Sequence, residues 1–258
     1  MTSADRITPG TVRITLHGAE IVRPTPDAAV KLFFPLPGQD TPKLAPPVTG
    51  DVVSWYRAYL AMPDAVRPPM RTYTVRATRP NLAEFDVDFV VHDHGGPASR
   101  WASSAQLGDT VAFLGPAGIY VVPEGARWRL LVGDRTALPA IASIIESAPA
   151  GTPLRAFVSV DDHAECQSLP GADVRWVVRD DLVEALRFTR LEDGVHAWIA
   201  GEASMVRAVR RHLIDECGLD RHAVSFHGYW RRNLSEEDVG REGLRRIDAG
   251  LDPNEDDP

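Results

Sequence analysis

The chain has 258 residues, which is enough for one large domain or two domains of ordinary size. Hydrophobic residues make up 44% of it and charged residues 25%, ordinary values for a globular protein that argue against general disorder. The net charge is −8 and no basic stripe runs along the sequence, so we exclude nucleic acid as a partner.

Most of the negative charge lies near the end of the chain. Residues 235–258 hold nine acidic and three basic residues, a net charge of −6, which leaves −2 for the remaining sequence. Segments with one dominant charge are usually solvated and mobile. We therefore expect an acidic, mobile tail over 235–258.

The cysteines and the apolar segments bear on the compartment. Cys166 and Cys217 are the two cysteines of the chain, which excludes a four-cysteine iron–sulfur cluster within it and gives no disulfide framework. The first ten residues carry neither an apolar signal core nor clustered positive charge, and no window holds about 18 consecutive apolar residues. We expect a soluble, cytoplasmic monomer with no membrane insertion.

The first half of the chain has the pattern of β structure. Glu84–His92 is the clearest strand, because Phe85, Val87 and Phe89 alternate with other residues, two of them acidic. A proline-rich loop covers 35–49. Short strands between Pro/Gly turns predict an antiparallel β-barrel or a sandwich. The other expected strands are Thr11–Val22, Ala29–Phe34, Val52–Leu60, Arg71–Thr78 and Thr110–Leu114.

The second half alternates strands with helices, which predicts an α/β domain with a parallel sheet. We expect helices over Ala137–Ser147, Asp181–Phe188 and Ala203–Cys217, the last ending at Gly218, a usual C-cap residue. The chain is divided into a barrel domain over 1–123, an α/β domain over 124–234 and the tail. The expected strands of the α/β domain are Arg129–Val132, Leu154–Val160, Asp173–Val178, Val195–Ala200 and Val224–Tyr229.

The first of three segments with the chemistry of a flavin dinucleotide site is RTYTVR over 71–76, in an expected strand. A Tyr ring can cover one face of an isoalloxazine, and a neighbouring hydroxyl can bond its edge. An Arg can bind a diphosphate through two parallel hydrogen bonds. The alternative is an ordinary strand with two exposed arginines.

The second segment is HDHGGPASRWA over 92–102. Glycines let backbone N–H groups approach a phosphate closely, and a helix that begins near Pro97 would add its dipole. Trp101 could stack on an adenine. One alternative is a plain Gly-Gly turn with Trp101 in the core. Another is a metal site at His92, Asp93 and His94, which we set aside because neighbouring strand residues point to opposite faces.

The third segment is LLVGDRTALPAI over 130–141. A strand, a small turn and a helix start in this order suit the phosphate of a dinucleotide. The segment lacks the GxGxxG pattern, so a plain turn between a strand and a helix is the alternative.

Together these motifs resemble the siderophore-interacting proteins, FAD-dependent ferric-siderophore reductases within the ferredoxin–NADP reductase superfamily. The matching pieces are RTYTVR, the HxxGGPASxWA run, GDRTALPAI, and GEASMVRAVRRHL followed by GYWRR, and they occur in family order over residues 10–235. The resemblance implies an N-terminal flavin-binding barrel and a C-terminal NAD(P)-binding-like α/β domain. It implies FAD and either NADH or NADPH as cofactors.

The resemblance also implies site residues, none of them catalytic, because the flavin carries the chemistry. Those expected to contact FAD are Arg71, Thr72, Tyr73, Thr74, Asp88, Val90, His92, Gly95, Gly96, Ala98 and Ser99, with Trp101 nearby. Those expected at the nicotinamide end, or over the second flavin face, are Asp134, Thr136, Ala137, Gly201, Glu202, Tyr229 and Trp230.

Two positions depart from the family pattern. Asp93 stands where many relatives have a small residue, and Arg135 stands where they commonly have Glu. Arg135 is, with Arg231 and Arg232, a candidate for binding an anionic ferric siderophore. For Arg135 the alternative is an ion pair with Asp134 or Glu202.

The sequence therefore predicts a ferric-siderophore reductase that takes part in iron acquisition. The electron donor stays open: Asp161 and Asp162 end an expected strand where carboxylates disfavour a 2′-phosphate, which hints at NADH, and a ferredoxin is a further candidate. Two other functions remain. One is a flavin reductase that serves another redox partner, and the other is a siderophore-binding protein without flavin.

Overall fold

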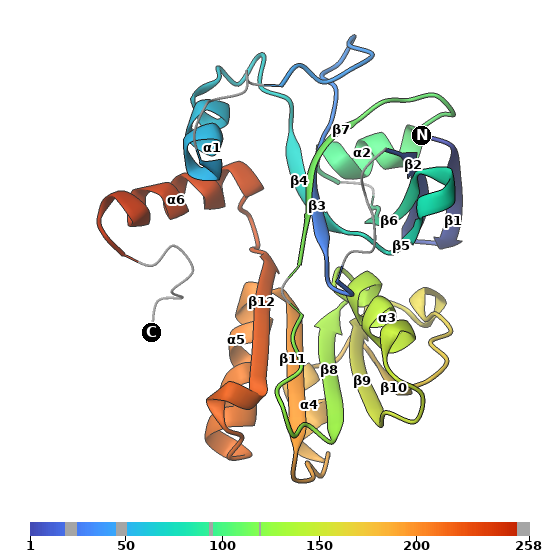
Figure 1. Cartoon of the computed structure of the whole chain (residues 1–258), viewed down its shortest axis with the longest axis vertical. Helices are drawn as coiled ribbons and strands as arrows, with labels where there is room; N and C mark the ends of the chain where they lie inside the picture. The colour runs from blue at the N-terminus through green and yellow to red at the C-terminus, as the bar shows by residue number, and fades with distance from the viewer. Residues whose placement is uncertain (19–24, 45–50, 93–94, 119, 252–258) are drawn as a thin grey trace.

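The computed structural model describes residues 1–18, 25–44, 51–92, 95–118 and 120–251. Two antiparallel sheets lie in the first half of the chain and one parallel sheet lies in the second half (Figure 1). Among the described residues, every helix is too short or too polar to span a lipid bilayer.

The two antiparallel sheets enclose one apolar core, which confirms the predicted barrel-like architecture. Helix α2 (Pro97–Ser104) packs against the four-stranded sheet. The strand order of that sheet is β1 (Ser3–Thr8), β2 (Thr11–His17), β6 (Glu84–Val90) and β5 (Ala77–Arg79), with a 3₁₀ turn at Pro80–Leu82. The order of the three-stranded sheet is β4 (Met70–Thr74), β3 (Ala29–Phe33) and β7 (Ala112–Ala117).

The alternation predicted in β6 is present. Phe85, Val87 and Phe89 are fully buried in the barrel core, while the carboxylates of Asp86 and Asp88 bind arginines outside that core. The single strand predicted over Arg71–Thr78 is wrong in one respect, because it divides into β4 and β5, which belong to different sheets.

The segment predicted as a strand over Val52–Leu60 is a helix, α1 (Val52–Ala61). Its β-branched and aromatic composition favours a strand. However, Asp51 accepts a hydrogen bond from a first-turn N–H at 2.7 Å and caps the helix. Trp55 and Tyr59, one helical turn apart, pack against the three-stranded sheet. The helical period therefore decides which residues are buried.

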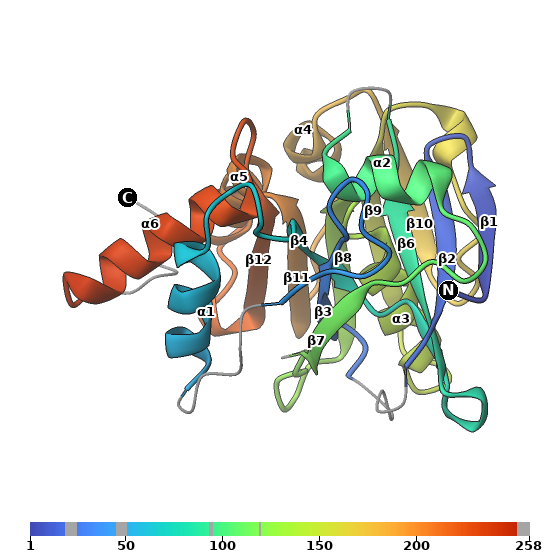
Figure 2. The same ribbon diagram turned by 90° about the horizontal axis from the view of Figure 1, so that it is seen from above.

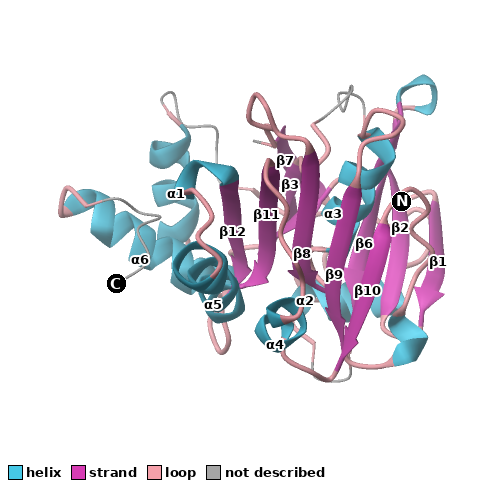
Figure 3. Ribbon diagram, turned by 90° about the horizontal axis from the view of Figure 1, so that it is seen from below, coloured by secondary structure: helices cyan, strands magenta, loops and turns pink. Residues whose placement is uncertain are grey.

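The second half is a five-stranded parallel sheet between helices, as predicted (Figure 3). Its strand order is β10 (Asp173–Val178), β9 (Leu154–Val160), β8 (Trp128–Asp134), β11 (Val195–Glu202) and β12 (Val224–Trp230). The helices are α3 (Leu138–Ser147), α4 (Leu182–Arg187) and α5 (Ala203–Arg211), with a π turn at His212–Glu216 and 3₁₀ turns at His163–Glu165 and Arg221–Ala223.

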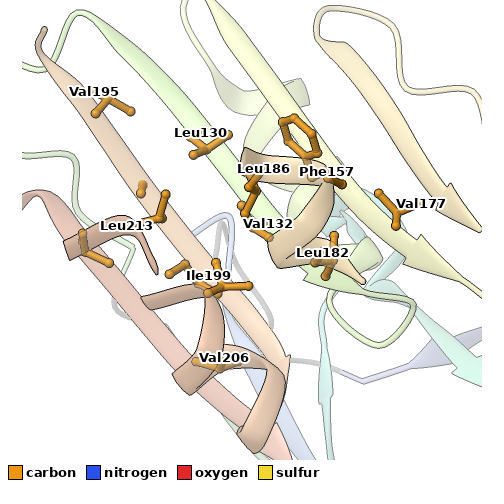
Figure 4. Close-up of a cluster of buried hydrophobic side chains, with 14 residues drawn as sticks. Leu130, Val132, Phe157, Val177, Leu182, Leu186, Val195, Ile199, Val206 and Leu213 are labelled. Atoms are coloured by element: carbon orange, nitrogen blue, oxygen red, sulfur yellow. The ribbon is translucent and has the colours of Figure 1, made fainter. Parts of the chain in front are cut away.

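Successive residues of the central strands enter different cores. Leu130 and Val132 of β8 lie in the cluster under α4 and α5 (Figure 4), whereas Leu131 between them packs with α3 on the other face. Ile199 and Trp198 of β11 divide in the same way. Burial on both faces explains the continuous apolar runs in these strands.

The order of the parallel strands reverses at one point of the sheet. The chain begins this sheet at β8 and builds β9 and β10 on one side and β11 and β12 on the other. Ligands of open α/β sheets bind outside the carboxyl ends of the strands where this order reverses, which is between β8 and β11. That edge faces the barrel (Figure 1).

The expectation of a mobile tail from residue 235 is wrong for 236–248, which form helix α6 (Glu236–Asp248) beside α1 (Figure 2). Ser235 and Asp238 form a capping box, and the acidic first turn and basic last turn both suit the helix dipole. Leu244 packs into the cluster under α1. Residues 252–258 lie outside the described residues.

Candidate functional site

The candidate site lies where the carboxyl ends of the parallel strands meet strand β4 of the barrel. Tyr229, near the end of β12, lies close to Thr74 of β4, whose hydroxyl favours ionisation of the phenol. Burial nevertheless dominates and raises the pKa of Tyr229, so its phenol stays protonated at neutral pH. Residues from both halves of the chain therefore meet at this junction.

Asp134, the last residue of β8, organises the sheet edge of this site. Its Oδ1 accepts hydrogen bonds from the N–H of Thr136 at 2.8 Å and from the hydroxyl of that residue at 2.5 Å. Its Oδ2 accepts from the N–H of Glu202 at 2.7 Å and from the indole N–H of Trp230 at 3.0 Å. One carboxylate thus joins the ends of β8, β11 and β12.

Gly201 makes room for this carboxylate. A Cβ atom at Gly201 would lie 2.6 Å from the Asp134 carboxyl group and 2.7 Å from the methyl group of Met205. Its φ of +138° also lies in the region that favours glycine. The β11–α5 turn therefore requires glycine at this position.

Glu202 follows as the N-cap of α5. It accepts hydrogen bonds from the N–H groups of Ser204 and Met205 at 3.0 and 3.1 Å. Burial alone would raise the pKa of Glu202, but these bonds and the Ser204 hydroxyl outweigh it and lower the pKa. The side chain is therefore a charged structural cap, and a role in nicotinamide binding stays a prediction.

Aromatic side chains supply the flat surfaces of the site. The Tyr73 ring packs on Phe89 with 4.4 Å between ring centroids, and burial raises the pKa of its phenol. On the α/β side, Tyr229 is 38% exposed and Trp230 is 42% exposed, although both are large apolar groups. Exposed aromatic rings at a domain junction suit stacking against a planar ligand.

The glycine segment before α2 has the features of an anion-binding turn. Gly96 is the N-cap and offers no capping side chain, and Pro97 occupies the first turn. The first-turn N–H groups of the buried Ala98 and Ser99 are therefore not used by a cap. The Ser99 hydroxyl instead accepts from the N–H of His92 at 3.2 Å and closes the loop.

The arginine and first threonine of RTYTVR are bound by helix α6. Arg71 pairs with Glu237 at 2.8 Å, and Glu236 accepts from both the N–H and the hydroxyl of Thr72 at 2.7 and 2.6 Å. Sequence reasoning missed both carboxylates. The available signal was the Ser-x-x-Asp capping pattern at 235–238, which indicates a helix start.

Several residues that the sequence predicts to contact FAD have neighbours within the protein instead. Trp101 is half-buried and packs against the barrel core, with its ring centroid 5.4 Å from that of Phe34 and 5.8 Å from that of Phe89, which is closer to the alternative of a core tryptophan. Asp88 is buried and pairs with Arg13 at 2.6 Å. Two further residues from the predicted set lie at the ends of elements. Val90 is half-buried at the end of β6, and Ala137 is fully buried at the start of α3.

The three candidate substrate arginines differ in their surroundings. The side chain of Arg135 is 16% exposed and pairs at 3.4 Å with both Asp161 and Glu165. The expected alternative partners, Asp134 and Glu202, are not the ones that it binds. Arg231 pairs with Glu242 at 3.3 Å. Arg232 is exposed, and its charge helps to lower the pKa of a site carboxylate, Glu202.

Asp93 and His94 lie outside the described residues. Within the described part of the chain, no group of three or more His, Cys, Asp or Glu side chains could hold a metal ion.

Comparison with known families covers nearly the whole chain. A family model described as the siderophore-interacting FAD-binding domain matches residues 1–120, and a second, siderophore-interacting protein, matches residues 126–233. The chain belongs to the siderophore-interacting protein family. This confirms the resemblance seen in the sequence motifs and makes FAD the cofactor of the barrel half.

Curated and solved members of this family align along most of their length. The NADPH-dependent ferric-chelate reductase of Escherichia coli is 35% identical, over 88% of this chain and 89% of that protein. The ferric vibriobactin reductase ViuB of Vibrio cholerae is 32% identical, over 88% and 86%. A siderophore utilization protein from T. fusca has a crystal structure with a TM-score of 0.78 and 36% identity, covering 91% of this chain and 92% of that one.

The described residues fit FAD. The uncapped first turn of α2 offers backbone donors to a phosphate. The half-buried Tyr73 ring packs against the barrel core, to which Ala98 of α2 also belongs. Thr74 carries a hydroxyl at the junction with the α/β sheet. An aromatic face, a hydroxyl and phosphate donors are the three elements that a flavin dinucleotide requires.

Proposed function

We propose that the protein reduces ferric siderophores with electrons that bound FAD receives from a reduced nicotinamide, and that iron leaves as Fe(II). Membership of the siderophore-interacting family supports this function. The observation that carries it is the position of Tyr229, close to Thr74 of the strand that we assign to the flavin and at the sheet edge that we assign to the nicotinamide. A donor and an acceptor can therefore reach one flavin.

When bound, FAD supplies the redox chemistry by accepting a hydride and releasing electrons singly to Fe(III). Fe(II) is the weaker Lewis acid for hard oxygen ligands, so reduction weakens the chelate. Within the barrel half we assign the flavin ring to Tyr73 and Thr74. The diphosphate is assigned to Arg71, Gly96 and Ser99.

On the α/β side, residues of the chain orient the groups around an entering nicotinamide and shield the junction from water. Asp134 fixes Thr136 and the ring of Trp230 at the strand ends where a nicotinamide would enter. Tyr229 and Trp230 present apolar surface there that excludes water from the junction. No general acid or base is assigned, because transfer of electrons to chelated iron requires none.

For the iron chelate we assign the exposed Arg232 as a binding residue. Ferric siderophores are often anionic, and an arginine at the rim would attract them. Arg135 and Arg231 are engaged by carboxylates of the same chain, so their contribution to substrate binding is smaller in this proposal.

The donor and the compartment complete the proposal. Asp161 and Asp162 follow β9, and the first is 83% exposed in its side chain, so carboxylates there favour NADH over NADPH. A ferredoxin is the further donor to test. The cysteines Cys166 and Cys217 are free thiols, which supports a reducing compartment, the cytoplasm. We place the boundary between the two domains between residues 123 and 124.

The test begins with the flavin and continues with iron. The purified protein should absorb near ~450 nm from bound flavin. Under anaerobic conditions, NADH, NADPH or reduced ferredoxin should drive Fe(II) release from a hydroxamate, catecholate or carboxylate chelate into an Fe(II) trap. A colourless protein that cannot be reconstituted with FAD contradicts the proposal. Rapid flavin reduction without iron release from any chelate would instead indicate a flavin reductase for another partner.

A further inference from the structure

Helix α6 brings a buried carboxylate to the flavin strand. Glu237 is 8% exposed and accepts hydrogen bonds from the N–H of Met70 at 3.1 Å and from the Tyr59 hydroxyl at 3.2 Å. Both of its oxygens also accept from Nη1 of Arg71, at 2.9 and 2.8 Å. Burial would raise the pKa of Glu237, but Arg71 and these donors outweigh it and lower the pKa, so the side chain is charged at neutral pH.

The guanidinium group of Arg71 is held through one nitrogen. Nη1 also donates to the carbonyl oxygen of Met70 at 2.5 Å, so every side-chain hydrogen bond of Arg71 to the described residues uses Nη1. The Nε and Nη2 donors are left for another acceptor. These two N–H groups form the parallel pair that binds two oxygens of a phosphate or carboxylate.

The acidic residues at the start of α6 act on β4 as a pair. Strand β4 is an edge strand of its sheet. Its outward N–H groups at Met70 and Thr72 donate to Glu237 and Glu236 respectively. Glu236 also binds Lys31 at 2.7 Å. The carboxylates therefore fix the backbone of β4 as well as the side chain of Arg71.

We propose that Glu237 is a positioning residue of the flavin site, which holds Arg71 so that its Nε and Nη2 donors bind the FAD diphosphate. This inference rests on the proposed function. A free Arg side chain loses rotamer freedom when it binds a phosphate. The ion pair with Glu237 removes that freedom before the cofactor arrives, which strengthens binding by preorganisation. Helix α6 is thereby part of the cofactor site, although it follows the α/β domain in the chain.

The alternative is that Glu237 competes with FAD for Arg71, in which case the ion pair would weaken FAD binding. A competing carboxylate would occupy the paired donors of the guanidinium group, as bidentate ion pairs do. Glu237 instead saturates a single nitrogen and leaves the pair open. The geometry therefore favours support of the cofactor over exclusion of it.

The test measures FAD affinity of the full-length protein after removal of bound flavin. Glu237→Gln keeps the volume of the side chain and removes its charge. We expect its Kd for FAD to rise about tenfold. The control is Asp248→Asn, which breaks the ion pair with Arg57 at the other end of α6 and should change the Kd by less than about twofold. An unchanged or lower Kd in Glu237→Gln overturns the inference.

A double-mutant cycle separates positioning from mere support of the fold. In an Arg71→Ala background, Glu237→Gln should cause no further loss of FAD affinity, because its effect passes through Arg71. Affinity for riboflavin, which has no phosphate, should be the same with and without the Glu237→Gln substitution. Additive losses, or equal losses for FAD and riboflavin, overturn the inference.

Tyr59→Phe repeats the test without a change of buried charge. It removes the hydroxyl that donates to Glu237 at 3.2 Å and to the carbonyl oxygen of Pro68 at 2.9 Å. It should raise the Kd for FAD about twofold to threefold in the wild-type background and not at all with Arg71→Ala, whereas a loss that came from the Pro68 bond would persist with Arg71→Ala. No effect in the wild-type background counts against the inference. Failure of the wild-type protein itself to bind FAD would contradict the proposed function, which distinguishes the two results.

Discussion

The indole N–H of Trp230 donates to Oδ2 of Asp134 at 3.0 Å. This bond connects the ends of β12 and β8 across β11, which lies between them in the sheet. It holds a half-exposed aromatic ring at the edge that faces the flavin strand. The same carboxylate binds the N–H of Glu202, so the ring and the β11–α5 turn are held together.

Asp134→Asn should impair flavin reduction without impairing FAD binding. An amide has one acceptor oxygen, so an NH₂ group would face at least one of the donors that Asp134 now accepts. We expect flavin reduction by NADH or NADPH to slow about tenfold, because Trp230 loses its fixed orientation, while the Kd for FAD changes little. Stopped-flow absorbance under anaerobic conditions measures the rate. Trp230→Phe is the matched second variant, since it removes the same hydrogen bond from the side of the indole. An unchanged rate in both variants would refute the role of this bond in flavin reduction.

Gly201→Ala should destabilise the α/β half. The added Cβ would meet the Asp134 carboxyl group at 2.6 Å, at a φ of +138° that L-residues rarely adopt. We expect a loss of roughly 2 kcal/mol in the free energy of unfolding, measured by urea denaturation. Gly125→Ala is the control, because Gly125 has a φ of +84° but nothing within 4 Å of the new atom. Equal losses in both variants would show that backbone strain, not the contact with Asp134, sets the cost.

The fold was predictable from the sequence where one period dominates. Strands β9 and β10 begin and end at the predicted residues, because runs of apolar residues bounded by polar turns allow one interpretation. Helix α1 was not predictable by composition, since its β-branched and aromatic residues favour a strand. Helix α6 was hidden by its charge, although its capping residues were present in the sequence.

The site was predictable only in its local parts. The motifs locate Tyr73, Thr74 and Asp134 correctly on a strand or at a strand end. The partner of Arg71 is 166 residues away in the sequence, and nothing in either segment indicates that they meet. Arg135 is a similar case, because its partner Glu165 lies in a short 3₁₀ turn that no periodicity marks.

Arg135→Ala and Arg232→Ala should have different effects. Glu165 is 5% exposed and accepts from the Thr8 hydroxyl at 2.5 Å and from the N–H of Gly10 at 2.7 Å, so with Arg135 it joins the α/β half to the barrel. Loss of Arg135 should lower the free energy of unfolding by about 1–3 kcal/mol. It should leave the KM for a ferric siderophore within about twofold.

Arg232→Ala should show the reverse, because Arg232 is exposed at the site rim. We expect the KM for an anionic ferric siderophore to rise about fivefold at low ionic strength, and less at high salt. Steady-state iron release with a neutral chelate is the control and should not respond. A larger rise in KM from Arg135→Ala than from Arg232→Ala would reverse the assignment.

His196 should make stability depend on pH. Burial, followed by the charge of Arg129, lowers the pKa of His196 from 6.5 to about 4, and the ring is 1% exposed with Nδ1 lacking a partner among the described residues. Between pH 6.5 and about 4 the unfolded chain binds a proton that the folded protein does not, so the free energy of unfolding falls as the pH is lowered through this window. The loss due to His196 should approach roughly 3 kcal/mol at pH 4. Urea denaturation of the wild type and of His196→Phe at pH 7 and pH 4 measures it. The variant should lose less stability between the two pH values, and an equal loss would show that other groups account for the acid sensitivity.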